Sequence, residues 1–266
     1  MGIEGAQRPP QQYRVPVTTR VTTKPHAGAE PPDPGFDRYT SKPIAAARYV
    51  AQRVLLGGVI RTILTVRILG RERLAELRGA FVVVANHSSH LDAPLIFTTL
   101  PRRLARYLSA GAAADYFFDV RWRKGLTALF FNAFPIHRSG VDRPASEARA
   151  LLRRGVPLLV FPEGTRSRTG RIGAFKAGAA ALANAESVPC VPVAIIGAGL
   201  AHPRGSKWPK AGRPPVAVVF GDPVFANAGE TPVDYMRRVR GEVQRLHDEH
   251  AHAVLSTGRA TSGGHR

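Results

Sequence analysis

Short apolar runs alternate with longer amphipathic stretches along the chain from residue 80 onward. The short runs are rich in β-branched or aromatic residues and are typical of strands, whereas the longer stretches have helical periodicity. The expected strands are 81–85, 107–109, 134–136, 158–161, 190–196 and 216–220, and the expected helices are 91–100, 122–130, 144–153 and 175–185. This alternation predicts an α/β domain with a largely parallel central sheet covered by helices on both faces.

The segment before this domain has a different pattern. Residues 44–69 are rich in aliphatic side chains, but Arg53, Arg61 and Arg67 fall on one arc of a helical wheel. We therefore expect an N-terminal amphipathic helical segment, divided into two helices at Gly57–Gly58. A basic amphipathic segment suits the headgroup boundary of a membrane, and a helical pair that covers the core is an equal alternative.

The two ends of the chain are polar. Residues 1–40 are rich in proline and poor in aliphatic residues, so we expect them to be disordered. A final helix is expected to begin at Thr231-Pro232, with a hydroxyl cap, a proline in the first turn and an acid three residues after the cap. The predicted organisation is a Pro-rich leader (1–40), membrane-surface helices (41–72), an α/β domain (73–251) and a flexible tail (252–266).

The large positive net charge of the chain indicates an anionic partner. The chain has 38 Lys and Arg against 19 Asp and Glu, a net charge of +19. Phospholipid headgroups, nucleic acid and a phosphorylated substrate all fit this excess, and a general compositional bias towards Arg and Ala explains part of it. The single cysteine, Cys190, excludes an internal disulfide and suggests a reducing compartment. No apolar stretch reaches the ~18 residues of a spanning helix, so we expect contact with a membrane to be peripheral.

The first candidate for chemistry lies in the segment Asn86–Asp92, directly after the apolar run 81–85. Its His87 and Asp92 are five positions apart, and a carboxylate bonded to one imidazole nitrogen would prepare the other nitrogen to act as a general base. A simple helix-capping arrangement is the alternative. Zinc is a further alternative because His90 lies nearby, but the spacing does not match that of zinc hydrolases, and we expect no metal.

The second candidate is the turn at 161–167, which follows the apolar run 157–160. A glycine there exposes backbone amides, and neighbouring hydroxyl and guanidinium groups can donate to phosphate oxygens. The candidate substrate-binding residues are Glu163, Gly164, Thr165, Arg166 and Lys176, with Arg138 as a further cation. A basic surface turn in which Glu163 pairs only with Arg166 is the alternative.

These segments resemble the motifs of the glycerolipid acyltransferase superfamily, typified by the 1-acyl-sn-glycerol-3-phosphate acyltransferases. Asn86–Asp92 resembles the family's His-x4-Asp motif, and 161–167 matches its Phe-Pro-Glu-Gly-Thr-Arg-Ser block without a change. Residues 175–178 and 191–195 resemble two further blocks. The run 132–138 departs from the family pattern, because Asn132 stands where glycine is usual and Pro135 removes a backbone donor.

The resemblance implies the site and its reaction. His87, oriented by Asp92, would deprotonate an acceptor hydroxyl that attacks an acyl thioester carried by coenzyme A or acyl carrier protein. The turn at 163–166 would position the acceptor, with Arg138 at its phosphate, and no metal or other cofactor is used. The acyl site would be lined by Val191, Pro192 and Val193.

The implied function is transfer of a fatty acyl group to 1-acyl-sn-glycerol-3-phosphate, giving phosphatidic acid in phospholipid biosynthesis. The implied location is peripheral, on the cytoplasmic face of the cell membrane, with an anionic membrane surface as partner and no nucleic acid. Glycerol-3-phosphate or a lysophospholipid is an alternative acceptor. A non-catalytic basic protein that binds lipid or nucleic acid is the alternative from another class.

Overall fold

The computed structural model of the chain describes residues 37–113, 132, 134–136 and 143–262. Within these residues seven strands form one sheet in the order β1-β7-β6-β2-β5-β3-β4. The strands are β1 (Thr65–Leu69), β2 (Val82–Ala85), β3 (Ser109–Ala113), β4 (Phe134–Ile136), β5 (Leu158–Val160), β6 (Cys190–Ile196) and β7 (Pro215–Phe220).

The sheet is largely parallel, as predicted. All neighbouring strands run parallel except β6 and β7, which are antiparallel, so that β7 and the edge strand β1 run against the other five. Two details of the prediction are wrong. The strand expected at 107–109 begins only at Ser109, and β1 was expected to be helical.

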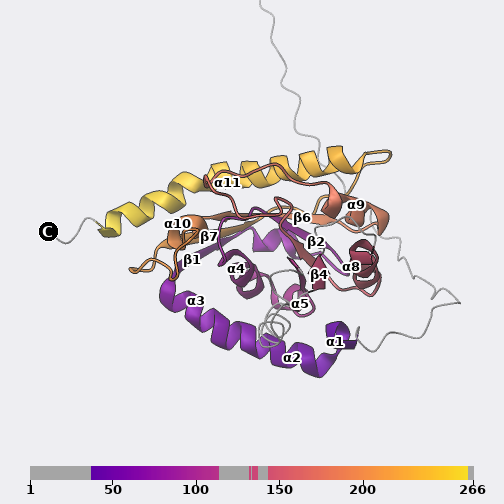
Figure 1. Cartoon of the computed structure of the whole chain (residues 1–266), viewed down its shortest axis with the longest axis horizontal. Coiled ribbons are helices and arrows are strands. Elements are labelled where there is room, and N and C mark those ends of the chain that lie inside the picture. Colours follow the sequence, from indigo (N-terminus) through magenta and orange to yellow (C-terminus); the bar gives the residue numbers. More distant parts are fainter. Residues whose placement is uncertain (1–36, 114–131, 133, 137–142, 263–266) are drawn as a thin grey trace, which may run out of the picture. The chain divides into compact units, whose positions relative to one another are not determined.

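Helices cover both faces of the sheet, which confirms the predicted fold class (Figure 1). One face carries α3 (Gly57–Ile63), α4 (Asp92–Thr99) and α5 (Arg102–Ala105), and the other carries α8 (Arg143–Arg153), α9 (Gly178–Ala185) and α11 (Pro232–Ser262). Three further short elements are α1 (Asp37–Thr40), η3 (Arg71–Leu74) and α10 (Ala198–Ala201).

The central strands are buried on both sides, which explains their unbroken apolar sequences. Every residue of β2 and of β6 is buried. Val83 faces the layer of α4, whereas Val82 and Val84 pack with α8 and α9. A parallel sheet covered by helices on both faces requires this pattern, because neither face is left to water.

The N-terminal helical run differs from its prediction. It comprises α2 (Lys42–Val50), the π-helical η2 (Ala51–Leu56) and α3, and it stays helical through Gly57 and Gly58 instead of dividing there. Helix ends at Ile63, because residues 65–69 form β1, so the expected helical segment 41–72 is too long.

The outward face of this run is aliphatic, and two of its arginines are directed inward. Arg48 is only 2% exposed, and the guanidinium of Arg53 donates to the carbonyls of Thr98 and Leu100 at the end of α4. Arg53 therefore does not lie on an outer basic face, as its position on the helical wheel suggested. The exposed aliphatic residues of the run are Ile44, Val50, Val54, Leu55 and Val59.

Both polar ends of the chain contain more structure than expected where they are described. Tyr39, within the predicted leader, is 2% exposed, and its hydroxyl donates to Glu147 over 3.3 Å. Helix α11 extends to Ser262, so the tail expected from residue 252 is helical over most of its length. Its predicted start is confirmed, because the Thr231 hydroxyl accepts from the Asp234 amide over 3.2 Å. Residues 1–36 and the helix expected at 122–130 lie outside the described residues.

Candidate active site

The loop that carries His87 begins where β2 ends. Asn86, the first residue after the strand, is 5% exposed, and its side-chain amide pairs with the backbone of Ile195 in the adjacent strand β6. Its Nδ2 donates to the Ile195 carbonyl over 2.9 Å, and its Oδ1 accepts from the Ile195 amide over 2.7 Å. This side chain continues the pairing of the two strands by one residue and fixes the direction in which the loop leaves the sheet.

His87 and Asp92 are in direct contact, as the spacing predicted. Asp92 lies in the first turn of α4, is fully buried, and its Oδ2 lies 2.8 Å from His87 Nδ1. The same oxygen accepts from the amides of Ser88 and Ser89 over 2.6 and 2.8 Å. Because a carboxylate only accepts, Nδ1 carries the proton, and Nε2 is left as a lone-pair base. The His87 side chain is 22% exposed.

Residues of the second motif make three contacts with His87. Glu163 Oε1 accepts from the His87 amide over 2.8 Å, and the Ser167 amide donates to the His87 carbonyl over 2.8 Å. The ring of Phe161 stacks on the imidazole with centroids 4.2 Å apart and planes 19° apart. The two sequence motifs therefore form one site, and the second motif fixes both the backbone and the ring plane of the histidine.

Glu163 acts on the backbone rather than on an arginine. Its second oxygen, Oε2, accepts from the Gly173 amide over 3.1 Å, so each carboxylate oxygen has a backbone donor. Partial burial raises the pKa of the Glu163 carboxyl above its ordinary value, against the lowering effect of the two N–H donors. Among the described residues no ion pair joins it to Arg166, so the alternative of a simple Glu–Arg surface turn is wrong.

Gly164, Thr165, Arg166 and Lys176 lie together at the turn, where two of them are cationic. Gly164 has φ +75°, and a Cβ added there would lie 3.3 Å from Lys176 Nζ, so the ammonium group lies directly against the turn. Thr165 and Lys176 are exposed, and Arg166 is partly exposed. Arg166 is close enough to His90 to lower the pKa of that histidine, although partial burial is the larger cause.

Sequence reasoning missed the residues that tie the segment after β6 to this site. The Arg204 guanidinium donates to the Arg166 carbonyl over 3.2 Å, and the buried Ser89 hydroxyl donates to the His202 carbonyl over 3.1 Å. Each contact joins a motif residue to a partner outside the motif blocks and more than thirty residues away, so local pattern gave no signal for it. The ring of His202 lies 6.0 Å from that of His90.

Two predicted assignments remain predictions. Arg138 lies outside the described residues. Val191 and Val193 have no exposed surface and pack in the core on the α4 face, while Pro192 is buried on the opposite side of β6. The three residues predicted to line the acyl site are therefore buried in the core of the domain.

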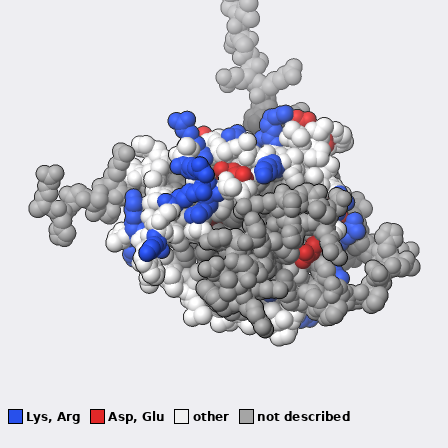
Figure 2. Space-filling model, in the orientation of Figure 1, with Lys and Arg blue, Asp and Glu red and all other residues white. Residues whose placement is uncertain are grey.

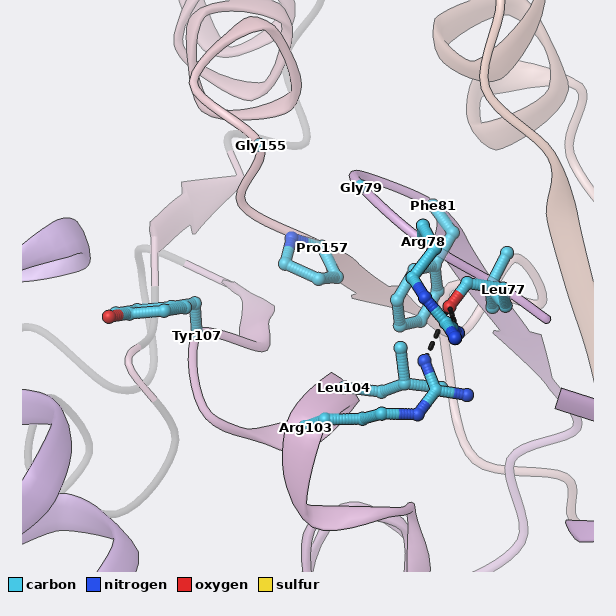
Figure 3. A pocket seen from close by; sticks show the side chains of 9 residues that line it. All are labelled: Leu77, Arg78, Gly79, Phe81, Arg103, Leu104, Tyr107, Gly155 and Pro157. Atoms are coloured by element: carbon cyan, nitrogen blue, oxygen red, sulfur yellow. Dashed lines mark hydrogen bonds between the residues drawn. The ribbon is translucent and has the colours of Figure 1, made fainter. Parts of the chain in front are cut away.

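A surface hollow of about 240 Å³ lies at the other end of the strands (Figure 3). It is lined by Phe81 and Pro157, which precede β2 and β5, whereas His87 follows β2. Figure 3 shows Arg103 directed at the carbonyl oxygen of Leu77, to which it donates. This hollow is therefore separate from the pair formed by His87 and Asp92.

Comparison with known proteins gives concordant matches. A family model described as Acyltransferase matches residues 65–196. A chloroplastic 1-acyl-sn-glycerol-3-phosphate acyltransferase of Brassica napus is 29% identical over 179 residues, which cover 67% of this chain and 51% of that protein. One from Chlamydomonas reinhardtii is 33% identical over 144 residues, which cover 53% and 42%. The chain thus spans about half the length of the curated relatives it matches.

The likeness extends to a solved structure. The crystal structure of the 1-acyl-sn-glycerophosphate (LPA) acyltransferase PlsC from Thermotoga maritima has a TM-score of 0.60 and 26% sequence identity, and the match covers 78% of each chain.

Proposed function

Since the chain belongs to the glycerolipid acyltransferase superfamily, we propose that it transfers a fatty acyl group from an acyl thioester to the free hydroxyl of 1-acyl-sn-glycerol-3-phosphate. The product is phosphatidic acid. The observation that carries the proposal is the contact between His87 and Asp92 beside a turn lined by Lys176 and Arg166. The pair supplies a general base, and the turn supplies donors for a phosphate.

The reaction follows from the pair. His87 Nε2 takes the proton of the acceptor hydroxyl while its oxygen attacks the thioester carbonyl carbon. The C–S bond then breaks, and the leaving thiolate receives from the imidazolium the proton that came from the acceptor hydroxyl. The Asp92 carboxylate stabilises the transient imidazolium through the 2.8 Å contact with Nδ1. A base positioned in this way contributes about 10²–10⁴-fold to the rate.

Acceptor recognition is assigned to the turn. The phosphate of the acceptor is a dianion near neutral pH, and the ammonium of Lys176, the guanidinium of Arg166 and the Thr165 hydroxyl can donate to it. Gly164 permits the left-handed backbone that the turn requires. Glu163 is a positioning residue, because its oxygens hold the backbone of His87 and Gly173.

The outward aliphatic face of the N-terminal helical run is assigned to the membrane. Val54, Leu55 and Val59 are 55–63% exposed on neighbouring turns of η2 and α3, which is unusual for side chains of this size in a soluble domain. No described helix has the length and apolarity required to cross a bilayer. The run would lie in the headgroup boundary with its inward side packed on α4.

The test is release of free thiol from acyl-coenzyme A and from acyl carrier protein, each with a panel of acceptors. The wild type is expected to prefer 1-acyl-sn-glycerol-3-phosphate over glycerol-3-phosphate and over lysophospholipids with larger headgroups. His87→Ala is expected to lose at least about 10²-fold in rate. Turnover with another acceptor alone would overturn the substrate assignment, and unchanged turnover in His87→Ala would overturn the mechanism.

A further inference from the structure

The loop at 203–214, which joins α10 to β7, exposes a tryptophan among basic residues. The Trp208 side chain is 82% exposed, the largest exposed fraction among the exposed large apolar residues of the described chain. The loop contains no acidic residue and four exposed basic ones, Arg204, Lys207, Lys210 and Arg213. Figure 2 shows Lys and Arg side chains gathered over the region where Figure 1 labels α10 and β7.

This loop lies beside the end of the helical run. Residues 208–213 and the α3 residues Thr62 and Ile63 line a shallow hollow of about 310 Å³. The Thr65 hydroxyl donates to the Arg213 carbonyl over 3.1 Å, which fixes the second half of the loop to the start of β1. The exposed Val59 lies one turn before Thr62, so the aliphatic face of the run continues towards the tryptophan.

The other end of the loop contacts the active site. Arg204 donates to the carbonyl of Arg166 in the cationic turn, and His202, just before the loop, accepts from Ser89 beside the catalytic pair. The loop is therefore attached to the exposed aliphatic run at one end and to the catalytic loops at the other.

We propose that loop 203–214 is a second membrane contact, in which Trp208 enters the headgroup boundary of an anionic bilayer while Lys207, Lys210 and Arg213 contact lipid phosphates. Tryptophan prefers this boundary because its ring is apolar and its N–H is polar. Each nearby Lys or Arg adds attraction to an anionic surface. An acidic protein partner would also match the charge, but the continuity with exposed aliphatic side chains favours lipid.

If the chain has the proposed function, contact of loop 203–214 with the bilayer also affects how the acceptor reaches the site. Arg204 joins the loop to the turn that carries Arg166, so a bilayer contact at Trp208 holds that turn close to the lipid surface, where an amphiphilic acceptor can reach His87. Binding to vesicles is independent of catalysis. Its measurement therefore separates failure of this inference from failure of the proposed activity.

The experiment uses the full chain with vesicles of phosphatidylcholine alone or mixed in equal parts with phosphatidylglycerol. The chain has two tryptophans, and Trp122→Phe leaves Trp208 as the only indole. We expect a blue shift of its emission and quenching by brominated lipid with the anionic vesicles only. The difference spectrum between wild type and Trp208→Ala gives the same information without the Trp122 substitution.

Vesicle affinity provides the second measurement. Lys207→Gln with Lys210→Gln is expected to weaken binding to anionic vesicles about fivefold per residue, and Trp208→Ala about tenfold. The matched control is Phe225→Ala, a 57% exposed aromatic residue beside Val224, which bridges to Cys190 at the opposite end of β6. Unchanged emission and equal affinity of the Trp208 variant would overturn the inference. A shift with acyl carrier protein but not with vesicles would overturn it in favour of a protein partner.

Discussion

Replacing Asp92 by asparagine tests the catalytic pair most directly. The substitution keeps an oxygen that can accept from the amides of Ser88 and Ser89, but it removes the charge that faces His87 Nδ1 at 2.8 Å. With charge centres about 4 Å apart and an effective dielectric constant of about 20, the lost attraction to the imidazolium is about 4 kcal/mol. At about 1.4 kcal/mol per tenfold, this corresponds to a loss of roughly 10³-fold in kcat.

The assay is the initial rate of thiol release at saturating donor and acceptor, together with the melting temperature of each variant. Asp222→Asn is the control, because that carboxylate is 72% exposed and pairs only loosely with Arg73 over 3.6 Å. The control is expected to keep the wild-type rate. If Asp92→Asn folds normally and retains more than about a tenth of the activity, the imidazolium does not depend on the carboxylate, and the mechanism is refuted.

Three further predictions concern the turn and the helical run. Glu163→Gln leaves one backbone N–H without an acceptor, so we expect about 1–3 kcal/mol lower stability in urea melts and about tenfold lower kcat. Burial raises the Glu163 pKa, so its contribution to stability is present below the ordinary carboxyl value and is lost as pH rises through the raised pKa. The stability of wild type relative to Gln should therefore fall as pH rises above the ordinary carboxyl pKa, and a rise would contradict this sign. Gly164→Ala places a Cβ 3.3 Å from Lys176 Nζ at φ +75°, so acceptor KM should rise more than kcat falls, and an unchanged KM would argue against phosphate binding there. Val54→Ser with Leu55→Ser should reduce flotation with vesicles while thiol release with a short-chain acceptor persists, and equal flotation would exclude the helical run as a membrane contact.

The fold class and the contact between His87 and Asp92 could be predicted because their signals are local. The β2 and β6 sequences are uninterrupted apolar runs, which a parallel sheet covered on both faces requires. The contact between His87 and Asp92 needs only a strand end and the first turn of the next helix, so a spacing of five residues was sufficient.

Elements that depend on distant partners were not predicted. Residues 65–69 are as aliphatic as the helix before them, and they form β1 because β7, about 150 residues later, offers a free edge. The helical wheel placed Arg53 on an outer face because it gives the direction of each side chain around the helix axis and not the position of neighbouring helices. The carbonyls at the end of α4 that accept from Arg53 lie 45 and 47 residues away in the sequence. Glu163 looked like a substrate contact because its two backbone partners are invisible in sequence.

Helix α4 determines how the proposed membrane contact of the helical run can best be removed. Its first turn carries Asp92, and the carbonyls at its far end, about 12 Å away, accept from Arg53 and Arg71. Truncation before the sheet would remove Arg53 and expose the far end of the helix whose first turn carries Asp92. Replacing the outward aliphatic side chains with polar ones keeps the hydrogen bonds from Arg53 to the end of α4. Substitution is therefore better than truncation as a way to remove the proposed membrane contact.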